Sequence, residues 1–321
     1  MGRYIIRRVL WIFLVLFIVT GITFIIFFVM PPTDPAVLAA GRNPTQSTIA
    51  EIRHIFGTDK PAYVQYGKFM YRLFHGDQYG WPGFGFSYQN LQPVREELYK
   101  RLPVTVSLAI GAAVVWLMIG IPIGIVSGLK RRSIADRAAM AFALFGVSMP
   151  VFWLALLMLY FLWFKLGIAC PSGYVPLSGG VGSWACHMAM PWFALALLYA
   201  AWYARMVRGN ILETMTEDYI RTARAKGLPE RTVVFKHGLR GALTPVVTMF
   251  GMDLGFLLGG AIITETVFNL PGIGRYGYEA IRNSDLPAIQ GTTLLTAFVI
   301  VIANLIVDVT YAYLDPRVRY T

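Results

Sequence analysis

Charge is scarce in this sequence. Only 14% of its 321 residues are Asp, Glu, Lys or Arg, whereas 56% are hydrophobic. A soluble protein of this length needs far more charge to cover its surface. The composition therefore argues against a soluble globular protein and favours a chain that lies in lipid.

Residues that bind metals or nucleotides are also few. Two cysteines and four scattered histidines form no metal-site pattern. The sequence contains no Gly-x-x-x-x-Gly-Lys-Ser/Thr loop for nucleoside triphosphates. "PGIGRYG" at 271–277 has the glycine spacing of a dinucleotide fingerprint. However, it follows a predicted transmembrane helix rather than a strand, so we predict a tight turn in an outer loop.

Long hydrophobic runs are abundant instead. A bilayer core of about 30 Å takes roughly 20 helical residues to cross. Six runs have that length, and they predict an all-α polytopic membrane protein with six transmembrane helices: Val9–Met30, Leu102–Leu129, Ala138–Phe164, Met188–Ala204, Leu243–Ile263 and Ile289–Tyr313. The first run is too long for a secretory signal and lacks a small-residue cleavage site, so we interpret it as a retained span.

The basic residues predict the topology. Seventeen of the 28 Lys and Arg fall in the amino terminus, in "KRRSIADR" at 130–137, in the insert 205–240 and in the last seven residues. Because short cytoplasmic loops are enriched in basic residues, we expect these four segments and both termini in the cytoplasm. This distribution also explains the net charge of +11 without nucleic-acid binding.

Cys170 and Cys186 lie in one short outer loop between the third and fourth runs. The outer compartment permits disulfides, so we expect a bridge between them. Two free thiols are the alternative.

The segment 31–101 is the only sizeable region on the outer side, and we expect it to form a small helical cap. Thr48 has the spacing of a capping box with Glu51, and that helix should end at Gly57. A second helix is expected to start at Pro61 and to stop near Gly76. The chain then divides into 1–30 as amino-terminal arm and first helix, 31–101 as cap, and 102–321 as a five-helix core.

Two of the runs carry glycines at every fourth position, and two contain carboxylates. Such small-residue stripes permit close helix packing in lipid, either within one subunit or between subunits. A carboxylate at the centre of a span costs roughly 2.5–3.5 kcal/mol to insert, so it either lines a pathway or is hydrogen-bonded inside the bundle. Candidate packing residues are Gly120, Gly124, Gly128, Gly251, Gly255 and Gly259; candidate pathway carboxylates are Asp253 near the centre of the fifth run, Glu265 and Asp308.

The basic insert "EDYIRTARAKGLPERTVVFKHGLRGALTP" from Glu217 to Pro245 interrupts these apolar runs. Thr216 is a suitable N-cap, Gly227 suits a left-handed C-terminal position, and Pro229 can open a second helix. Tyr219, Ala223 and Gly227 follow at intervals of four residues, so an aromatic anchor precedes nearly bare backbone. The first helix therefore suits either a groove on another protein or the surface of an anionic membrane.

"DYIRTARAKGL" from Asp218 to Leu228 resembles the cytoplasmic loop of binding-protein-dependent ABC importer permeases. The core pattern of that loop is Glu-Ala-Ala, three residues, then Gly. Alignment on Gly227 places Arg221, Thr222 and Ala223 at the first three positions. Further segments resemble the dipeptide and oligopeptide branch of this family: "DKPAYVQY" from Asp59, "RLPVTVSLAI" from Arg101, "GVSMPVFWLALLML" from Gly146, "GAIITETVFNLPGIGRYGYEAIRNSDLPAIQG" from Gly260 and "NLIVDVTYAYLDPRVR" from Asn304.

The resemblance implies the permease architecture of a type I ABC importer in a bacterial cytoplasmic membrane. It implies that the loop 209–242 docks on a cytoplasmic ATPase, with Tyr219, Ala223 and Gly227 as docking residues and Arg221 and Arg224 at the rim. The chain itself would be non-catalytic and hold no cofactor, with ATP and Mg on two separate ATPase subunits. A second, homologous permease and an extracytoplasmic binding protein complete the implied complex.

Short peptides are the substrate class that the resemblance implies, with nickel chelates, oligosaccharides or opines as alternatives. An ion-coupled secondary transporter usually has ten or more spans, and it leaves the groove-binding helix unexplained. A membrane-embedded hydrolase needs a nucleophile and a base, but no span contains a histidine. ATP dependence of uptake separates the first rival from the importer.

Overall fold

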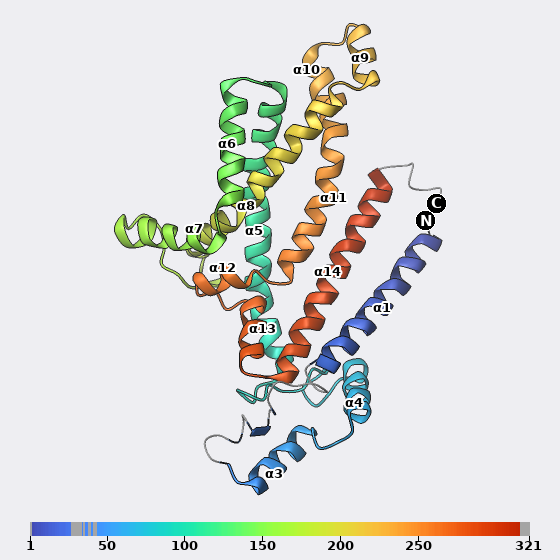
Figure 1. Ribbon diagram of the computed structural model, residues 1–321, viewed down its shortest axis with the longest axis vertical. Helices are drawn as coiled ribbons and strands as arrows, with labels where there is room; N and C mark the ends of the chain where they lie inside the picture. The colour runs from blue at the N-terminus through green and yellow to red at the C-terminus, as the bar shows by residue number, and fades with distance from the viewer. Residues whose placement is uncertain (1, 27–33, 35, 38–39, 41–43, 315–321) are drawn as a thin grey trace. The chain divides into compact units, whose positions relative to one another are not determined.

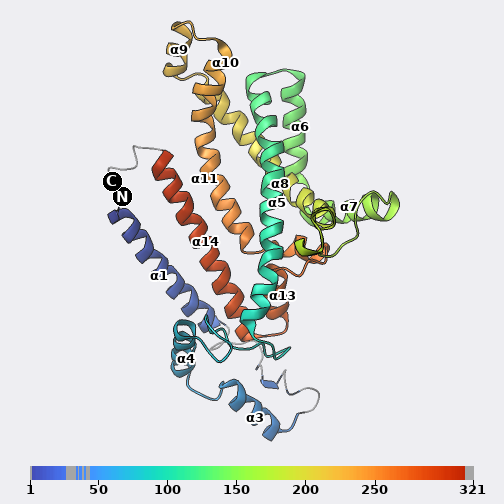
Figure 2. The ribbon, with the colours of Figure 1, turned by 180° about the vertical axis from the view of Figure 1, so that it is seen from behind.

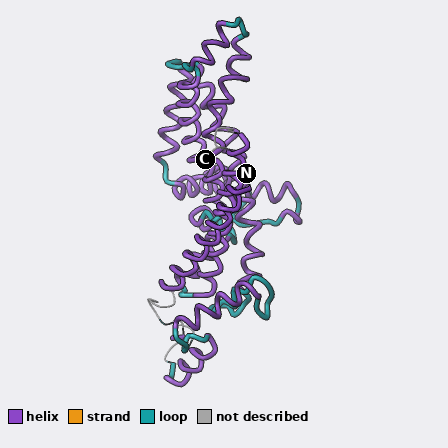
Figure 3. Tube along the Cα trace, turned by 90° about the vertical axis from the view of Figure 1, so that its right-hand side faces the viewer, coloured by secondary structure: helices purple, strands orange, loops and turns teal. Residues whose placement is uncertain are grey.

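The computed structural model describes residues 2–26, 34, 36–37, 40 and 44–314. Helices dominate these residues (Figures 1 and 3). Two isolated β-bridges, Asp77 with Gly80 and Phe86 with Pro93, lie between α4 and α5. The helices are α1 (Gly2–Phe24), α3 (Gln46–Phe56), α4 (Ala62–His75), α5 (Val94–Leu129), α6 (Ile134–Ser148), α7 (Val151–Met158), η2 (Leu159–Lys165), η3 (Leu177–Gly179), α8 (Val181–Thr214), α9 (Asp218–Ala225), α10 (Glu230–Thr232), η4 (Val233–Gly238), α11 (Leu239–Leu258), α12 (Ile262–Val267), α13 (Ile273–Arg282) and α14 (Leu286–Leu314).

Among the described residues, four single helical stretches are long and apolar enough to cross a membrane: 94–129, 181–214, 230–258 and 286–306. The first two contain the second and fourth expected runs, the third covers residues 243–258 of the fifth run, and the last covers residues 289–306 of the sixth. The apolar part of α1, Leu10–Phe24, is shorter. Residues 27–30 of the first expected run lie outside the described residues.

The third expected run is not one straight helix. It bends by 99° between α6 and the pair α7 and η2. Met149 has extended φ and ψ of −85° and 126°, and Pro150 follows it with no N–H to continue the helix. A residue before proline avoids the α-helical region, which explains the break at this position.

The chain forms two compact units. The first unit comprises 1–105, 258–262 and 271–302, and the second comprises 106–257, 263–270 and 303–321.

In the first unit, the cap residues pack on the starts of two long helices. One apolar core joins α5, α13 and α14 through Val94, Leu98, Tyr276, Ala280, Leu286, Ala288 and Ile289. Asp285 fixes the loop before α5, because its carboxylate accepts hydrogen bonds from the Ser87 hydroxyl and the Tyr88 N–H. On the other side, Tyr66 of α4 packs on Phe24 of α1, with ring centroids 5.1 Å apart.

Two local predictions in this unit need correction. The N-cap of α3 is Thr45, whose hydroxyl accepts from the N–H of Thr48, so the helix begins one turn earlier than expected. "PGIGRYG" is not a tight turn, because Gly272 caps α13 and the glycines continue into that helix. A side chain at Gly274 would meet the Gly260 backbone at 3.0 Å, so Gly274 permits close packing there. Gly57 ends α3 in the left-handed region, as predicted.

In the second unit, α8 is the central helix. Side chains added at Gly120 and Gly124 of α5 would meet backbone oxygens of α8 at 2.8 and 2.7 Å, and one at Gly146 of α6 would meet Ala201. These glycines let α5 and α6 approach α8 closely. The turn between α5 and α6 and the pair α9 and α10 lie at the same end of this unit, at the top of Figures 1 and 2.

Candidate functional site

The basic insert folds as a helical hairpin at the end of α8. α9 covers eight residues, and Gly227 follows it with φ of 74°, the left-handed conformation that glycine adopts without steric cost. Pro229 then caps α10, which continues through η4 into α11. The expected helix, turn and helix are therefore present.

The start of α9 differs from the expectation in one respect. Glu217 rather than Thr216 is its N-cap residue. The Thr216 hydroxyl donates instead to the Glu213 carbonyl of α8, at 2.7 Å. A threonine hydroxyl bonds equally well to the preceding turn, and here it closes α8.

A small apolar core holds α9 against the hairpin. Ile220 and Ala223 are buried, and they cluster with Val233 of η4 and with Met215. Ala223 is only 6% exposed, so this expected docking residue faces the chain itself. The opposite face of α9, with Asp218, Arg221, Thr222 and Ala225, is exposed.

The remaining expected docking residues lie around that exposed face. Tyr219 is 47% exposed. Its hydroxyl lies so close to Gly241 of α11 that a Cβ atom added at Gly241 would be 2.6 Å from it. Arg221 pairs with Asp218 at 3.4 Å. Arg224 makes two hydrogen bonds to the Glu230 carboxylate, at 3.1 and 2.7 Å, and so links α9 to α10. This link fixes the turn around Gly227.

A buried carboxylate that the sequence analysis did not single out supports this end of the unit. Asp136 accepts from Arg208 Nε at 2.6 Å and Nη2 at 3.0 Å, from the Ser127 hydroxyl at 2.6 Å and from the Arg132 N–H at 2.8 Å. These contacts join the turn between α5 and α6 to α8 two turns before its end. The feature of the sequence that could have indicated this buried carboxylate is the one acidic residue in the basic segment "KRRSIADR".

Further contacts tie α8 to α11 beside the hairpin. Asn210 donates its side-chain amide to the Ala242 carbonyl at 3.0 Å. Gly238 of η4 packs closely on Met215, because a Cβ atom added at Gly238 would lie only 2.9 Å from the Met215 sulfur. Both helices that flank α9 are thus in direct contact.

Asp253 of α11 lies in an aromatic cluster with residues of α5 and α8. Its carboxylate accepts a hydrogen bond from the Tyr203 hydroxyl at 2.7 Å. The centroid of the Trp116 ring lies 4.7 Å from the ring centroid of Tyr199, 5.9 Å from that of Tyr203 and 6.0 Å from that of Phe250. Asp253 is half-buried and lies five residues before the end of α11.

The other candidate residues lie elsewhere. Glu265 is fully buried in α12. Gly251 and Gly255 are buried on α11, Gly259 lies just past its end, and a side chain at Gly128 would meet Ile211 of α8. The Asp308 side chain is outside the described residues.

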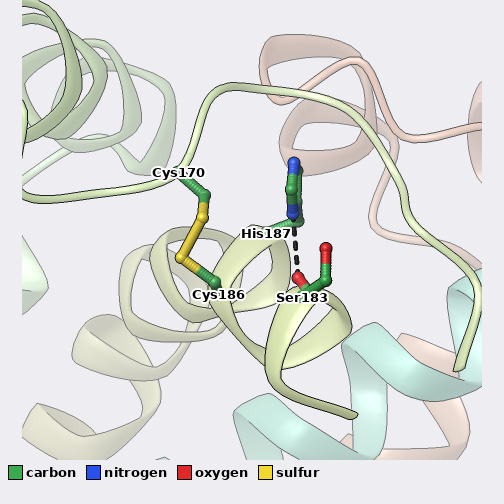
Figure 4. The surroundings of a disulfide bond; sticks show 4 residues. All are labelled: Cys170, Ser183, Cys186 and His187. Carbon is green, nitrogen blue, oxygen red and sulfur yellow. Dashed lines mark hydrogen bonds between the residues drawn. A yellow bond between two sulfur atoms is a disulfide. The ribbon is translucent and has the colours of Figure 1, made fainter. Parts of the chain in front are cut away.

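The expected disulfide between Cys170 and Cys186 is present at the start of α8 (Figure 4). One turn of α8 is visible beside it, where His187 Nδ1 donates to the Ser183 carbonyl at 2.8 Å. α8 has 34 residues and is therefore about 50 Å long. The disulfide and α9 are at opposite ends of a helix that is longer than a bilayer is thick.

Two family models match most of the chain. Residues 120–320 match the family described as binding-protein-dependent transport system inner membrane component, and residues 1–109 match the N-terminal model of the same kind. The chain belongs to this family. It is a multi-pass inner-membrane permease, and the family name implies a substrate-binding protein as a partner.

Three relatives align with the whole chain and are covered completely themselves. A putative peptide transport system permease protein of Brucella abortus is 40% identical over 320 residues. The dipeptide transport system permease protein DppB of Alkalihalophilus pseudofirmus is 39% identical over 340 residues. The glutathione transport system permease protein GsiC of Escherichia coli K12 is 38% identical over 320 residues.

A solved structure shares the fold. The inward-facing MetNI methionine ABC transporter aligns with 70% of this chain and 98% of its own chain, with a TM-score of 0.55 and 20% identity. The permease is thus an ABC importer permease in fold.

Proposed function

We propose that this permease moves short peptides into the cytoplasm as part of an ATP-driven importer, and that α9 is its contact with the ATPase. The names of the three relatives, which refer to peptides, dipeptides and glutathione, support the substrate class. The observation that carries the coupling role is the hairpin itself. It presents an exposed helical face on a buried core at the end of α8.

The packing explains how force on α9 would reach the membrane helices. Ile220 and Ala223 anchor α9 to η4, and η4 continues directly into α11. Asp136 and Arg208 fix the neighbouring turn to α8. A push on the exposed face therefore moves α8 and α11 together rather than bending a loop.

The rest of the complex follows from this role. The permease itself is non-catalytic and holds no cofactor, and two separate ATPase subunits bind ATP and Mg. A second, homologous permease forms a heterodimer with this chain and completes the pathway. Asp253 lines that pathway and is held in place by the hydrogen bond from the Tyr203 hydroxyl, and Glu265 of α12 is a further pathway residue.

The docking face is tested by Ala225→Arg. Ala225 is exposed in the last turn of α9, so arginine blocks docking, and its charge suits the helix C-terminus. We expect the ATPase subunits to leave the purified complex while the second permease stays. Ala135→Arg is the matched control, because Ala135 is an exposed alanine at the same end of the unit.

Ala223→Glu is a less suitable test, because it would disrupt the core beneath α9. If ATPase remains bound to the Ala225→Arg variant and peptide uptake continues, the exposed face of α9 is not the docking surface. If wild-type complex in proteoliposomes takes up no peptide on addition of ATP, the proposed substrate class is wrong.

A further inference from the structure

A cavity in the first unit, which we name the cap pocket, is not used by the proposed transport mechanism. Its volume is about 590 Å³. It lies among α3, α4 and the loop before α5, and the start of α14 closes it. Its lining residues are His54, Ile55, Phe56, Gly57, Lys60, Gln65, Gly67, Lys68, Phe69, Tyr71, Arg72, Phe84, Gly85, Phe86, Tyr88, Pro287 and Gln290.

Aromatic rings make one rigid wall of the cap pocket. Phe56 and Tyr88 stack with centroids 3.8 Å apart and planes at 6°, and Phe86 packs edge-on against both. The Tyr88 N–H is held by Asp285. Burial raises the pKa of the Tyr88 hydroxyl, which therefore stays neutral. This wall is preformed and uncharged.

Three further lining residues are positively charged. Lys68 and Arg72 lie one turn apart on α4, and Lys60 precedes that helix. None of the lining residues that the structure describes is acidic. The neighbouring Lys60 lowers the pKa of Lys68, whereas the nearby Asp59 raises it.

Gln290 adds a second, independent observation. It is 4% exposed and lines the cap pocket, yet its amide nitrogen Nε2 has no hydrogen-bond partner in the described structure. A buried donor without a partner costs about 1–3 kcal/mol, so a bound acceptor would recover that energy. Cations together with an amide donor are the groups that recognise a carboxylate.

We propose that the cap pocket binds a carboxylate side chain of the substrate-binding protein when that protein docks. This inference rests on the proposed importer function. The cap 31–101 is assigned to the outer face, where the binding protein arrives. The charge of the pocket complements an acidic residue, and the ring wall accommodates its apolar neighbours. Asp285 is not among the lining residues, and its carboxylate accepts hydrogen bonds from the Ser87 hydroxyl and the Tyr88 N–H.

The experiment measures the affinity between the assembled complex in nanodiscs and the binding protein that purifies with it. We expect Lys68→Glu to weaken binding about tenfold or more, because it places a negative charge against the incoming carboxylate. Gln290→Leu removes the donor at constant charge and should weaken binding about fivefold. Lys165→Glu is the matched control, because it changes an exposed outer lysine outside the pocket and should change affinity by less than about twofold.

A second arm identifies the carboxylate. Amidation of the binding protein's carboxylates should give wild type and Lys68→Glu the same affinity. If the pocket variants bind the untreated protein as tightly as wild type does, the inference is wrong. If a free peptide with a C-terminal carboxylate binds the wild-type complex without the binding protein and loses affinity with Lys68→Glu, the occupant is the substrate instead.

Different results would contradict the further inference and the proposed function. A wild-type complex that imports peptides but is insensitive to pocket variants contradicts only the inference. A wild-type complex that neither binds a substrate-binding protein nor takes up peptide contradicts the proposed function.

Discussion

At the scale of single residues, one buried ion pair joins the turn between α5 and α6 to α8, the helix that leads into the hairpin. The Asp136 side chain is 6% exposed and that of Arg208 is 24% exposed. A buried charge is tolerated only when its partner and hydrogen bonds are complete, and Asp136 has contacts from Arg208, Ser127 and the Arg132 N–H. Removing one partner leaves the other charge uncompensated.

Arg208→Leu is therefore expected to lower the free energy of unfolding by about 3 kcal/mol. The double variant Asp136→Ala with Arg208→Leu should recover most of this loss, since no unpaired carboxylate remains. Unfolding of the purified permease in mixed micelles measures both values. If the double variant loses as much free energy of unfolding as Arg208→Leu and Asp136→Ala lose in sum, the two residues do not act as a pair.

The sequence alone could not reveal this pair. Asp136 and Arg208 are 72 positions apart, and each lies in a segment that reads as a charged cytoplasmic loop. The number of basic residues predicts the side of the membrane but not which charge is buried. Only the packing of α6 on α8 decides that.

At the scale of helices, the stripe of glycines on α5 has its partner on α8. The sequence left open whether the stripe packs within one subunit or between subunits. Side chains at Gly120, Gly124 and Gly128 would all meet residues of α8. The close approach that the spacing predicts thus occurs inside this chain.

Gly124→Ala tests that approach. Its added carbon would lie 2.6 Å from Val207 Cβ and 2.7 Å from the Ala204 carbonyl, so α5 and α8 must separate. We expect a loss of about 1–3 kcal/mol in the free energy of unfolding. Gly209→Ala on α8 is the matched control. Nothing lies within 4 Å of its added carbon, so it should gain up to about 1 kcal/mol from helix propensity. Equal effects of both changes would contradict tight packing at Gly124.

Helix ends were predicted where backbone chemistry decides them and missed where side chains compete. Gly57 and Gly227 end their helices as expected, because their left-handed φ suits glycine. Thr45 caps α3 in place of Thr48, since several hydroxyls near a helix start can serve. The hydropathy of the third run predicts a span but does not indicate the 99° bend at Pro150.

At the scale of the whole molecule, family and membrane class could be predicted because long apolar runs and the motif around Gly227 are local in the sequence. The cap pocket could not be predicted, because it joins residues 54–88 to Gln290 across the chain. The same holds for the cluster around Asp253, where Trp116 and Tyr203 come from two other helices.

Asp253→Asn separates a transport role from a structural one. Asparagine still accepts the Tyr203 hydrogen bond, while loss of the charge removes the cost of holding a carboxylate in an apolar helix. Stability should therefore stay equal or rise. Peptide uptake per ATP hydrolysed should fall about tenfold, since a carboxylate on the pathway attracts the peptide ammonium group.

Tyr203→Phe is the control for this change. It keeps the ring beside Trp116 and removes only the hydrogen bond, so it should lower stability by about 1 kcal/mol and leave the ratio of uptake to hydrolysis nearly unchanged. Uptake and ATP hydrolysis in proteoliposomes, together with unfolding in micelles, give all three quantities. If Asp253→Asn lowers stability and uptake together, and Tyr203→Phe does the same, the carboxylate is a structural hydrogen-bond acceptor of the bundle and not a pathway residue.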